Sequence, residues 1–329
     1  MQQKSILVTG GAGFIGAHAC KALARAGYVP VAYDNLTTGF ETSVRFGPLV
    51  QGDVRNSAQV ADALRAHQAV AIVHFAASAY VGESVSDPGK YYDNNVGGII
   101  ALLAGAREAG VNRLVFSSSC ATYGAPDRLP ISENTLQRPI NPYGRTKLMC
   151  EDILRDYAPA YDLRYAALRY FNAAGADPEG ELGEKHDPET HLIPLAMLAA
   201  AGKRAELGIY GTDYDTPDGT CIRDYIHVAD LARAHVLAVQ YLLEGGASVA
   251  MNLGSGQGMS VRQIIGAIEK YTGKPLPVRE EPRRAGDPPV LTADPSLAFE
   301  KLGFRTELSD IDTIVRHAAP WFGLRPVGN

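Results

Sequence analysis

The chain has 329 residues, of which 46% are hydrophobic, and a formal net charge of -5 at pH 7. This length and composition suffice to bury a large core, as one big domain or two interleaved ones. No long run of like charges occurs, so we expect neither a nucleic-acid partner nor an anionic membrane surface, both of which need a concentrated basic face.

Short apolar runs alternate with amphipathic stretches through the first half of the chain. Strands are predicted at residues 6–8, 31–33, 71–75, 114–116 and 165–169. Helices are predicted at residues 17–26, 60–66, 91–109 and 142–157. Strands that are apolar on both faces and joined by helices indicate a parallel sheet covered on both sides. Right-handed crossovers make this an α/β fold with a doubly wound, Rossmann-like sheet.

The second half of the chain has a different sequence pattern. Residues 173–191 are rich in glycine, proline and charge, which predicts a long loop, and such loops are often functional. A helix at 225–243 and a strand at 249–253 follow, and the pattern beyond Ser260 is smaller and mixed. We therefore expect two lobes, with the chain crossing between them more than once. The domain boundaries predicted are 1–171 plus about 225–254 for the Rossmann domain, and about 172–224 plus 255–329 for a smaller mixed α/β lobe.

The cysteines and histidines favour simple interpretations. The four cysteines lie far apart with no C-x-x-C pair, which favours free thiols in a reducing cytoplasm. His186 and His191 are the closest histidines, and with no third ligand in sight we interpret them as loop residues and expect no metal. The N-terminus lacks a signal peptide, and no apolar run approaches the roughly 18 residues of a spanning helix. A cytoplasmic protein without a membrane partner is expected.

A glycine-rich turn joins the first predicted strand to the first helix. Gly10, Gly13 and Gly16 would let backbone N–H groups approach a pyrophosphate, and the positive end of the helix would assist. Asp34 ends the second strand 18 residues after Gly16, where a carboxylate accepts both hydroxyls of a ribose and repels a 2′-phosphate. This favours NAD over NADP as cofactor. Asp53 is placed either to reach the adenine or to cap a loop.

The G-x-x-G-x-x-G spacing and several later motifs resemble the extended short-chain dehydrogenase/reductase family. These motifs are Asp53-Val54, residues 74–77, residues 94–96, residues 117–119, residues 143–147 and residues 169–172. Within the family the chain closely resembles the UDP-glucose 4-epimerases, on the motifs at 81–84, 91–96, 223–228 and 283–287. The resemblance covers nearly the whole chain, and its motifs occur in order.

A Tyr-x-x-x-Lys pair opens the predicted helix at 142–157. Tyr143 and Lys147 are four residues apart, so they lie on one face of the helix, and Ser119 ends the preceding strand. A lysine cation and a positively charged nicotinamide ring would stabilise the phenolate, and moving the tyrosine pKa from about 10 to about 7 needs roughly 4 kcal/mol. These three residues are the predicted catalytic group, with Tyr143 as the base and Ser119 bonded to the same sugar hydroxyl.

The resemblance also implies the residues that hold the cofactor and the substrate. The cofactor site would comprise Gly10, Gly13, Phe14, Ile15, Gly16, Asp34, Asn35, Asp53, Val54, Phe75, Ala76, Ala77, Asn94, Ser117, Tyr143, Lys147, Tyr170 and Phe171. The second lobe would bind the UDP-sugar through Asn172, Leu192, Tyr210, Arg223, Arg284, Asp287 and Leu291, together with Ser119. The two arginines suit diphosphate, and Asp287 would accept ribose hydroxyls. Leu291 would border the C2 substituent of the sugar, although a plain packing role fits it equally well.

By resemblance the activity is a reversible C4 epimerisation of UDP-glucose and UDP-galactose through a 4-keto sugar. Epimerisation of UDP-pentoses or UDP-N-acetylhexosamines is the alternative. A 4,6-dehydratase usually has an Asp-Glu pair where this chain has Cys120-Ala121, and a non-catalytic NAD sensor has usually lost the Tyr/Lys pair. The resemblance further implies a homodimer with a four-helix interface built from the helices at 91–109 and 142–157, which Ile99, Leu102, Leu103, Leu148 and Ile153 would fill.

Overall fold

The computed structural model describes residues 3–284 and 287–328. Seven parallel strands form the main sheet, in the order β10-β6-β5-β4-β1-β2-β3. Their bounds are β1 Ser5–Thr9, β2 Val29–Asp34, β3 Leu49–Gln51, β4 Ala69–His74, β5 Arg113–Ser119, β6 Arg164–Tyr170 and β10 Val249–Leu253. The order reverses between β1 and β4, which is where a doubly wound sheet opens a crevice for a ligand. The predicted fold class is confirmed.

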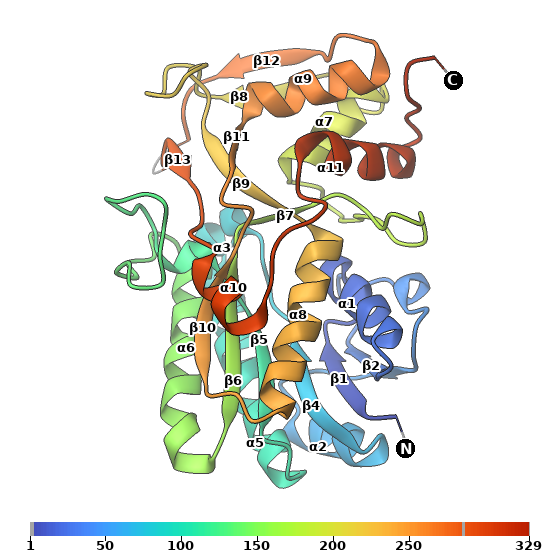
Figure 1. The fold of residues 1–329 in the computed structure, drawn as a ribbon, viewed down its shortest axis with the longest axis vertical. Coiled ribbons are helices and arrows are strands. Elements are labelled where there is room, and N and C mark those ends of the chain that lie inside the picture. Colours follow the sequence, from blue (N-terminus) through green and yellow to red (C-terminus); the bar gives the residue numbers. More distant parts are fainter. Residues whose placement is uncertain (1–2, 285–286, 329) are drawn as a thin grey trace.

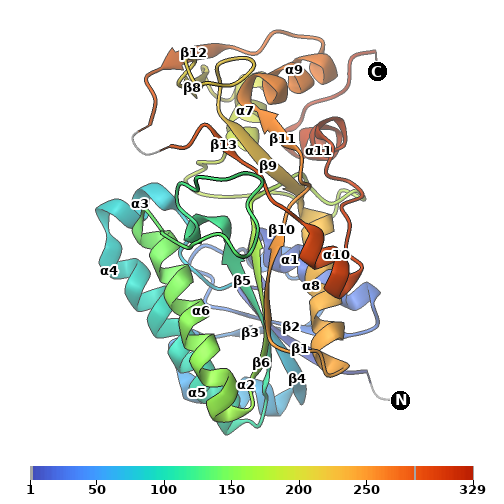
Figure 2. The same cartoon turned by 60° about the vertical axis from the view of Figure 1, so that its left-hand side comes forward.

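Helices cover both faces of this sheet (Figures 1 and 2). Helices α1 (Phe14–Arg25), α8 (Val228–Leu243) and α10 (Ser296–Leu302) pack on one face, and α2 (Ser57–Ala66), α5 (Gly98–Glu108) and α6 (Pro142–Tyr161) on the other. Strand β1 shows why the strands are apolar on both sides: Ile6 and Val8 join the first core, Leu7 joins the second, and all three are fully buried.

The second lobe is built around strand β9 (Ile222–His227). It pairs in parallel with β7 (Asn172–Ala174) and β13 (Val290–Leu291), and antiparallel with β11 (Gly258–Ser260). A separate parallel pair joins β8 (Leu207–Tyr210) to β12 (Val278–Glu281). Helices α7 (Leu192–Ala200), α9 (Val261–Thr272) and α11 (Ile311–Ala318) enclose the core of this lobe, which lies at the top of Figure 1.

Two sequence expectations for the secondary structure are wrong in part. The predicted helix at 225–243 begins only at Val228, because Tyr225 to His227 pair with β7 as the end of β9. The predicted helix at 91–109 is divided into α4 (Pro88–Tyr91), a π-helical segment (Tyr92–Gly97) and α5. Such π-helical turns are frequent at functional sites.

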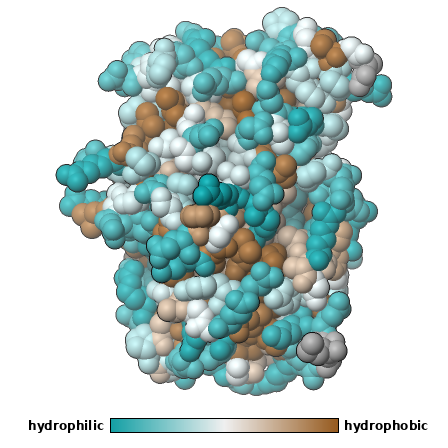
Figure 3. Space-filling model, in the orientation of Figure 1, coloured by the Kyte–Doolittle hydropathy of each residue, from teal (hydrophilic) through white to brown (hydrophobic). Residues whose placement is uncertain are grey.

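The remaining short elements connect these layers. They are α3 (Val81–Ser86) and the 3-10 turns Glu41–Ser43, Cys120–Thr122 and Ala319–Phe322. None of the helices in the described ranges is both long and apolar enough to cross a membrane. On the face seen in Figure 3, hydrophilic residues predominate at the edges, and hydrophobic residues gather below the middle, over the lobe of the seven-stranded sheet.

Candidate active site

The glycine turn lies at the carboxyl edge of β1, against the loop that follows β4. Gly10 adopts a left-handed conformation with φ of 71°, and a Cβ there would lie 2.7 Å from the Ala76 nitrogen. A Cβ on Gly16 would lie 2.0 Å from the Gly10 carbonyl oxygen. Both positions therefore require glycine. Helix α1 begins at Phe14, and no side chain caps it at Gly13, so its first turn can direct N–H groups toward an anion.

Asp34 ends strand β2 beside this turn, as predicted from the sequence. Its buried carboxylate accepts hydrogen bonds from the backbone N–H groups of Ala12 (3.0 Å) and Leu36 (2.9 Å). A carboxylate has about four lone-pair sites, so it can still accept ribose hydroxyls. The tight glycine turn and the carboxylate together fit a dinucleotide whose ribose carries free hydroxyls.

Asp53 lies near the same edge, next to β3. The Arg55 guanidinium donates hydrogen bonds to it at 2.7 and 3.0 Å and lowers its pKa to about 2, and the Asn35 amide donates at 3.3 Å. The ion pair holds this carboxylate in place. Arg55 also donates a hydrogen bond to Asp93. Sequence reasoning missed Arg55, although its position two residues after Asp53 could have indicated the ion pair.

The predicted catalytic residues meet at the carboxyl edge of β5. Ser119 ends that strand, and Tyr143 lies in the first turn of α6, which begins at Pro142 and is capped by the Asn141 side chain. One turn later, the Lys147 ammonium lies 5.9 Å from the Tyr143 ring centroid and donates to the Ser117 carbonyl at 2.8 Å. The pair on one helix face and the strand-end serine are therefore brought together as expected.

Burial dominates the electrostatics of this group. It raises the pKa of the Tyr143 phenol above its usual value, Tyr170 adds to the rise, and a hydrogen bond with Ser119 opposes it. Burial also lowers the pKa of Lys147 to about 8. Burial thus favours the neutral phenol, and a cation placed beside it would favour the phenolate.

Two asparagines of the π-helical segment connect the cofactor edge to the catalytic helix. The Asn95 side chain accepts from the Ser78 N–H at 2.8 Å and donates to the Thr146 hydroxyl at 3.0 Å, and Asn94 donates to Asn95. Asn95 thereby ties the loop after β4 to α6. Sequence reasoning selected Asn94 and overlooked Asn95, although both belong to one motif.

A buried ion pair joins strand β6 to the catalytic helix α6. Arg169 of β6 and Glu151 of α6 are both about 95% or more buried, and their side chains approach to 2.6 Å. Glu151 also accepts from the Ser118 hydroxyl, and Arg169 donates to the Tyr123 hydroxyl at 2.8 Å. Sequence reasoning missed this pair. Glu151 lies four residues after Lys147 on α6, which is the signal for a shared face.

The other nominated cofactor residues line the same edge of the sheet. The Ser117 hydroxyl lies 2.7 Å from the Tyr170 hydroxyl, and the Phe75 ring packs against His235 with centroids 4.6 Å apart. Val54 is buried near Gly98 at the start of α5. Ile15, Ala76, Ala77 and Phe171 complete the set on α1, after β4 and after β6.

The nominated substrate residues are distributed over several elements of the second lobe. Arg223 of β9 forms an ion pair with Asp287 and lies beside Leu291 in the strand register. The Arg284 guanidinium stacks 4.0 Å from the centroid of Tyr210. Ala285 and Gly286, which belong to the same motif, lie outside the described residues. Asn172 starts β7 and donates to the Asp224 carbonyl at 3.0 Å, and Leu192 starts α7.

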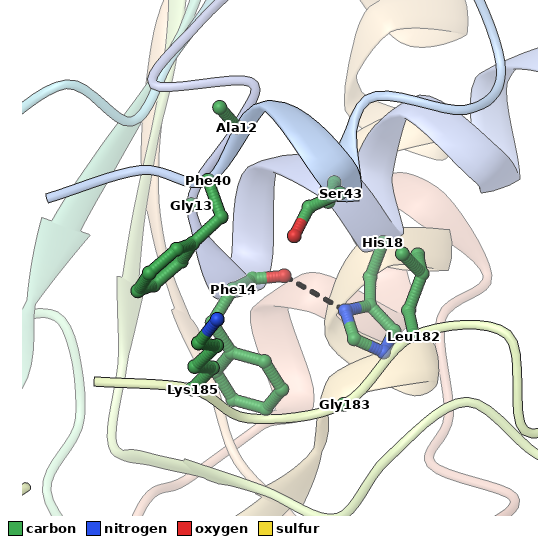
Figure 4. A pocket seen from close by; sticks show the side chains of 10 residues that line it. Ala12, Gly13, Phe14, His18, Phe40, Ser43, Leu182, Gly183 and Lys185 are labelled. Carbon is green, nitrogen blue, oxygen red and sulfur yellow. Dashed lines mark hydrogen bonds between the residues drawn. The ribbon is translucent and has the colours of Figure 1, made fainter. Parts of the chain in front are cut away.

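The long loop between β7 and α7 reaches from the second lobe to the glycine turn. Leu182, Gly183 and Lys185 line a small pocket with Phe14 and His18 of α1 (Figure 4). The Lys185 ammonium lies 3.9 Å from the centroid of the Phe40 ring, and Lys21 of α1 pairs with Asp177 at 2.6 Å. This loop therefore covers the start of α1, as its predicted functional character suggests.

His186 and His191 lie in this loop, as expected, but the premise that no third ligand is near them is wrong. His186 and His191 do have further candidate ligands, because Glu184 and Glu189 lie with them. Burial on its own would lower the pKa of His186, but hydrogen bonds with the two carboxylates outweigh it and raise the pKa to about 9. Sequence analysis considered only the two histidines, although the E-x-H-x-x-E-x-H spacing of residues 184–191 is a signal that includes both glutamates.

Comparison with known proteins gives consistent results over the whole chain. The NAD dependent epimerase/dehydratase family matches residues 6–254. A UDP-glucose 4-epimerase of Rhizobium meliloti (strain 1021) is 53% identical over 328 residues, 100% of both chains. The structure of UDP-glucose 4-epimerase from Brucella ovis in complex with NAD is 62% identical, with a TM-score of 0.97 over 98% of this chain and 99% of that one.

A second solved structure contains a sugar nucleotide. It is a UDP-glucose-4-epimerase from Stenotrophomonas maltophila with bound NAD and formylated UDP-arabinopyranose, and it is 42% identical. Its TM-score is 0.94, over 98% of each chain. The glycine turn, the Tyr143/Lys147 pair and the nominated residues of the second lobe thus occur on a backbone shared with NAD-containing structures.

The buried ion pair generates a stability prediction. Glu151→Leu leaves the Arg169 guanidinium buried and unpaired, so we expect it to lower the free energy of unfolding by about 3–5 kcal/mol in a urea titration. The double variant with Arg169→Leu should recover part of that loss. The control is Asp152→Ala, which removes an exposed pair with Arg155 on the same helix and should cost under about 1 kcal/mol. Equal losses for Glu151→Leu and the control would contradict the prediction.

Proposed function

Because the chain belongs to the NAD-dependent epimerase/dehydratase family, we propose that it interconverts UDP-glucose and UDP-galactose by inverting C4 of the sugar, with NAD as bound cofactor. The full-length identity of 53% to a curated enzyme of this activity carries the assignment. The clustering of Ser119, Tyr143 and Lys147 at the carboxyl edge of the sheet supports it. The enzyme is therefore an isomerase.

Tyr143 acts as the acid–base residue in the proposed mechanism. It accepts the proton of the C4 hydroxyl and later returns it, while Ser119 hydrogen-bonds the same oxygen. Lys147 lies on the same helix face and favours the phenolate through its charge. NAD, when bound, supplies a reversible hydride acceptor and the additional positive charge that the buried phenol requires, and net redox change over a turnover is zero.

The second lobe anchors the nucleotide while the 4-keto sugar turns over. Arg223 and Arg284 bind the diphosphate in this proposal, since planar guanidinium groups match phosphate oxygens. Asp287, which holds Arg223 in its ion pair, accepts ribose hydroxyls. Asn172, Leu192 and Tyr210 line the remainder of the nucleotide site. Without such an anchor the flipped sugar would leave before it is reduced.

In the proposed domain organisation, the two lobes bind different ligands. The Rossmann domain holds the cofactor through the glycine turn, Asp34, Asn35 and the loop after β4. The mixed lobe holds the nucleotide sugar. Strand β9 belongs to the sheet of the mixed lobe, so the returning segment of the Rossmann domain begins at Val228, three residues after the boundary expected from the sequence.

We further propose a homodimer formed through α5 and α6. The residue-level expectation needs correction, because Ile99, Leu102 and Leu103 are 0–2% exposed and already pack inside the chain. Ile100 of α5 and Met149 of α6 are 46% and 38% exposed. These two apolar side chains are better placed to contact a second copy.

Leu291 is the proposed determinant of sugar selectivity. It is half-buried and packs with Cys120 against the apolar cluster of Tyr123, Ile131, Phe171 and Ala293. Cys120 directly follows Ser119, so this cluster adjoins the catalytic group. A leucine here leaves more room than a tyrosine and less than a cysteine, which favours hexoses over N-acetylhexosamines.

The assigned activity is tested with a panel of UDP-sugars. Incubation with UDP-glucose should yield UDP-galactose, and the reverse, without added reductant or oxidant. Products are separated by chromatography and compared with UDP-pentoses and UDP-N-acetylglucosamine as alternative substrates. Conversion of only the latter sugars would move the assignment to a sibling epimerase, and no conversion of any UDP-sugar would reject it.

Tyr143→Phe should reduce turnover of UDP-glucose by about 100-fold or more, because the ring remains and the proton-transferring hydroxyl is lost. Binding of UDP, measured by calorimetry, should be unchanged. Tyr157→Phe is the matched control. Tyr157 lies near the C-terminal end of the same helix, so this variant should retain full turnover. Near-normal turnover of Tyr143→Phe would refute its role as the base.

Leu291→Cys should raise kcat/KM for UDP-N-acetylglucosamine, and Leu291→Tyr should abolish it while UDP-glucose turnover changes little. An imperfect steric fit in such a pocket changes specificity by roughly 10- to 200-fold. The ratio of the two specificity constants is the quantity to measure. If both variants leave that ratio unchanged, Leu291 does not control access to the C2 substituent.

Light scattering at micromolar concentration should give the mass of a dimer. Ile100→Glu combined with Met149→Glu should shift it to the monomer, because two charges would be buried in the interface. Val85→Glu is the control, since this side chain is 65% exposed on α3, outside the proposed helices. A monomer mass for the unmodified chain would contradict the proposal.

A further inference from the structure

Four potential metal ligands converge in the loop between β7 and α7. Glu184, His186, Glu189 and His191 each direct one ligand atom inward, a carboxylate oxygen or an imidazole Nδ1, and these four atoms all lie within 4.8 Å of one another. The four residues occupy eight consecutive positions in an E-x-H-x-x-E-x-H pattern. None of them belongs to the proposed catalytic group.

The distances between these atoms resemble ligand–ligand separations. His186 Nδ1 lies 3.3 Å from a carboxylate oxygen of Glu184 and 3.3 Å from one of Glu189. His191 Nδ1 lies 3.4 Å from the Glu184 oxygen and 2.8 Å from a Glu189 oxygen. Tetrahedral Zn²⁺ with bonds of about 2.0–2.2 Å separates its ligands by about 3.3–3.6 Å. The two distances to Glu184 Oε1 and the distance from His186 to Glu189 Oε2 match this value, whereas His191 approaches the other Glu189 oxygen, Oε1, at a hydrogen-bond distance.

The burial of the cluster adds to the argument. The side chains of Glu184 and Glu189 are only 4% and 11% exposed, and two carboxylates that share a buried point repel each other unless positive charge lies between them, either a metal ion or a proton on His186. Glu189 also accepts hydrogen bonds from the backbone N–H groups of Thr190 and His191, at 2.7 and 2.8 Å. Within 3–284 and 287–328, no lysine or arginine forms an ion pair with either carboxylate. Tyr80 packs against both histidine rings, with centroids 6.3 and 6.4 Å away.

A second acidic cluster in the same loop provides the contrast. Asp177, Glu179 and Glu181 also lie close together, but the Lys21 ammonium approaches all three, at 2.6, 3.0 and 2.6 Å. Their charge is therefore balanced by an amine from α1. The Glu184 cluster instead offers two imidazole nitrogens, which are metal ligands when neutral.

We propose that Glu184, His186, Glu189 and His191 form a structural Zn²⁺ site that fixes this loop. Two carboxylates and two neutral imidazoles balance the charge of one divalent cation. Nitrogen ligands and fourfold coordination favour zinc over magnesium or calcium, which prefer six or more oxygens. His191 is 46% exposed and provides access from solvent.

The consequence for the loop is a cross-link at the start of α7. His191 is the N-cap residue of that helix, so a bound ion would join the beginning of α7 to the segment that covers α1. The ion would hold the position of Leu192, the next residue. The importance of that position for substrate binding rests on the proposed function. The metal proposal itself is independent of the reaction.

The test is a titration of the full-length, chelator-treated protein with Co²⁺, whose visible absorption reports tetrahedral coordination. We expect one Co²⁺ per chain, displaced by Zn²⁺, and a melting temperature that rises by roughly 3–5 °C at about 100-fold excess over Kd. Glu184→Gln and His191→Ala should each weaken binding by at least about 10- to 100-fold, the range found even for outer-shell partners. His191→Ala removes an exposed side chain and keeps the test valid if Glu184→Gln does not fold.

Glu179→Gln is the matched control, because it alters the neighbouring acidic cluster and should leave Co²⁺ binding unchanged. The absence of saturable binding at micromolar Co²⁺ would overturn the proposal, and so would unchanged affinity in His191→Ala. In either case the cluster is an ion network held by a proton on His186. Neither result depends on turnover of a UDP-sugar, so failure here is distinguishable from failure of the proposed function.

Discussion

The close approach of the glycine turn to the loop after β4 is the constraint on which the rest of the site depends. Gly10 lies directly after β1 and Ala76 lies in the loop after β4, and these two strands are paired neighbours at the point where the strand order reverses. Any side chain at Gly10 would clash with the backbone at Ala76, so this close approach of the two loops requires glycine. Asp34 on one side and Ser119 on the other then lie along a single edge of one sheet.

Electrostatics at this edge depend on burial more than on fixed charges. Tyr143 and Lys147 are both buried, and burial disfavours the charged form of each. Below them the Arg169–Glu151 pair is held in place by Ser118 and Tyr123. In the proposed mechanism, the positive charge of the bound cofactor then favours the phenolate of Tyr143. Under that mechanism, proton removal is favoured in the complex that can also accept a hydride.

Local patterns were sufficient for the parts of the fold whose contacts are local. The glycine turn, Asp34 and the Tyr143/Lys147 pair follow from strand ends and helix periodicity. The start of α8 was misplaced because Tyr225 is apolar enough for either state, and only pairing with Asn172 makes it a strand. The π-helical segment depends on how Asn95 bonds Ser78 and Thr146, far away in sequence. The four residues of the Glu184 cluster are close in sequence, but their spacing alone did not show that the loop brings their side chains together.

The repeated crossing of the chain between lobes has a mechanical consequence. Helix α8 returns to the main sheet directly from β9, and α10 returns after β13, before α11 rejoins the upper core (Figure 1). The two lobes are therefore connected by several crossings of the polypeptide chain instead of one linker. Hinge closure about a single axis would bend all of them at once. Any relative movement of the two lobes therefore requires coordinated backbone changes at every crossing, whereas a loop or a side chain between the lobes can move on its own.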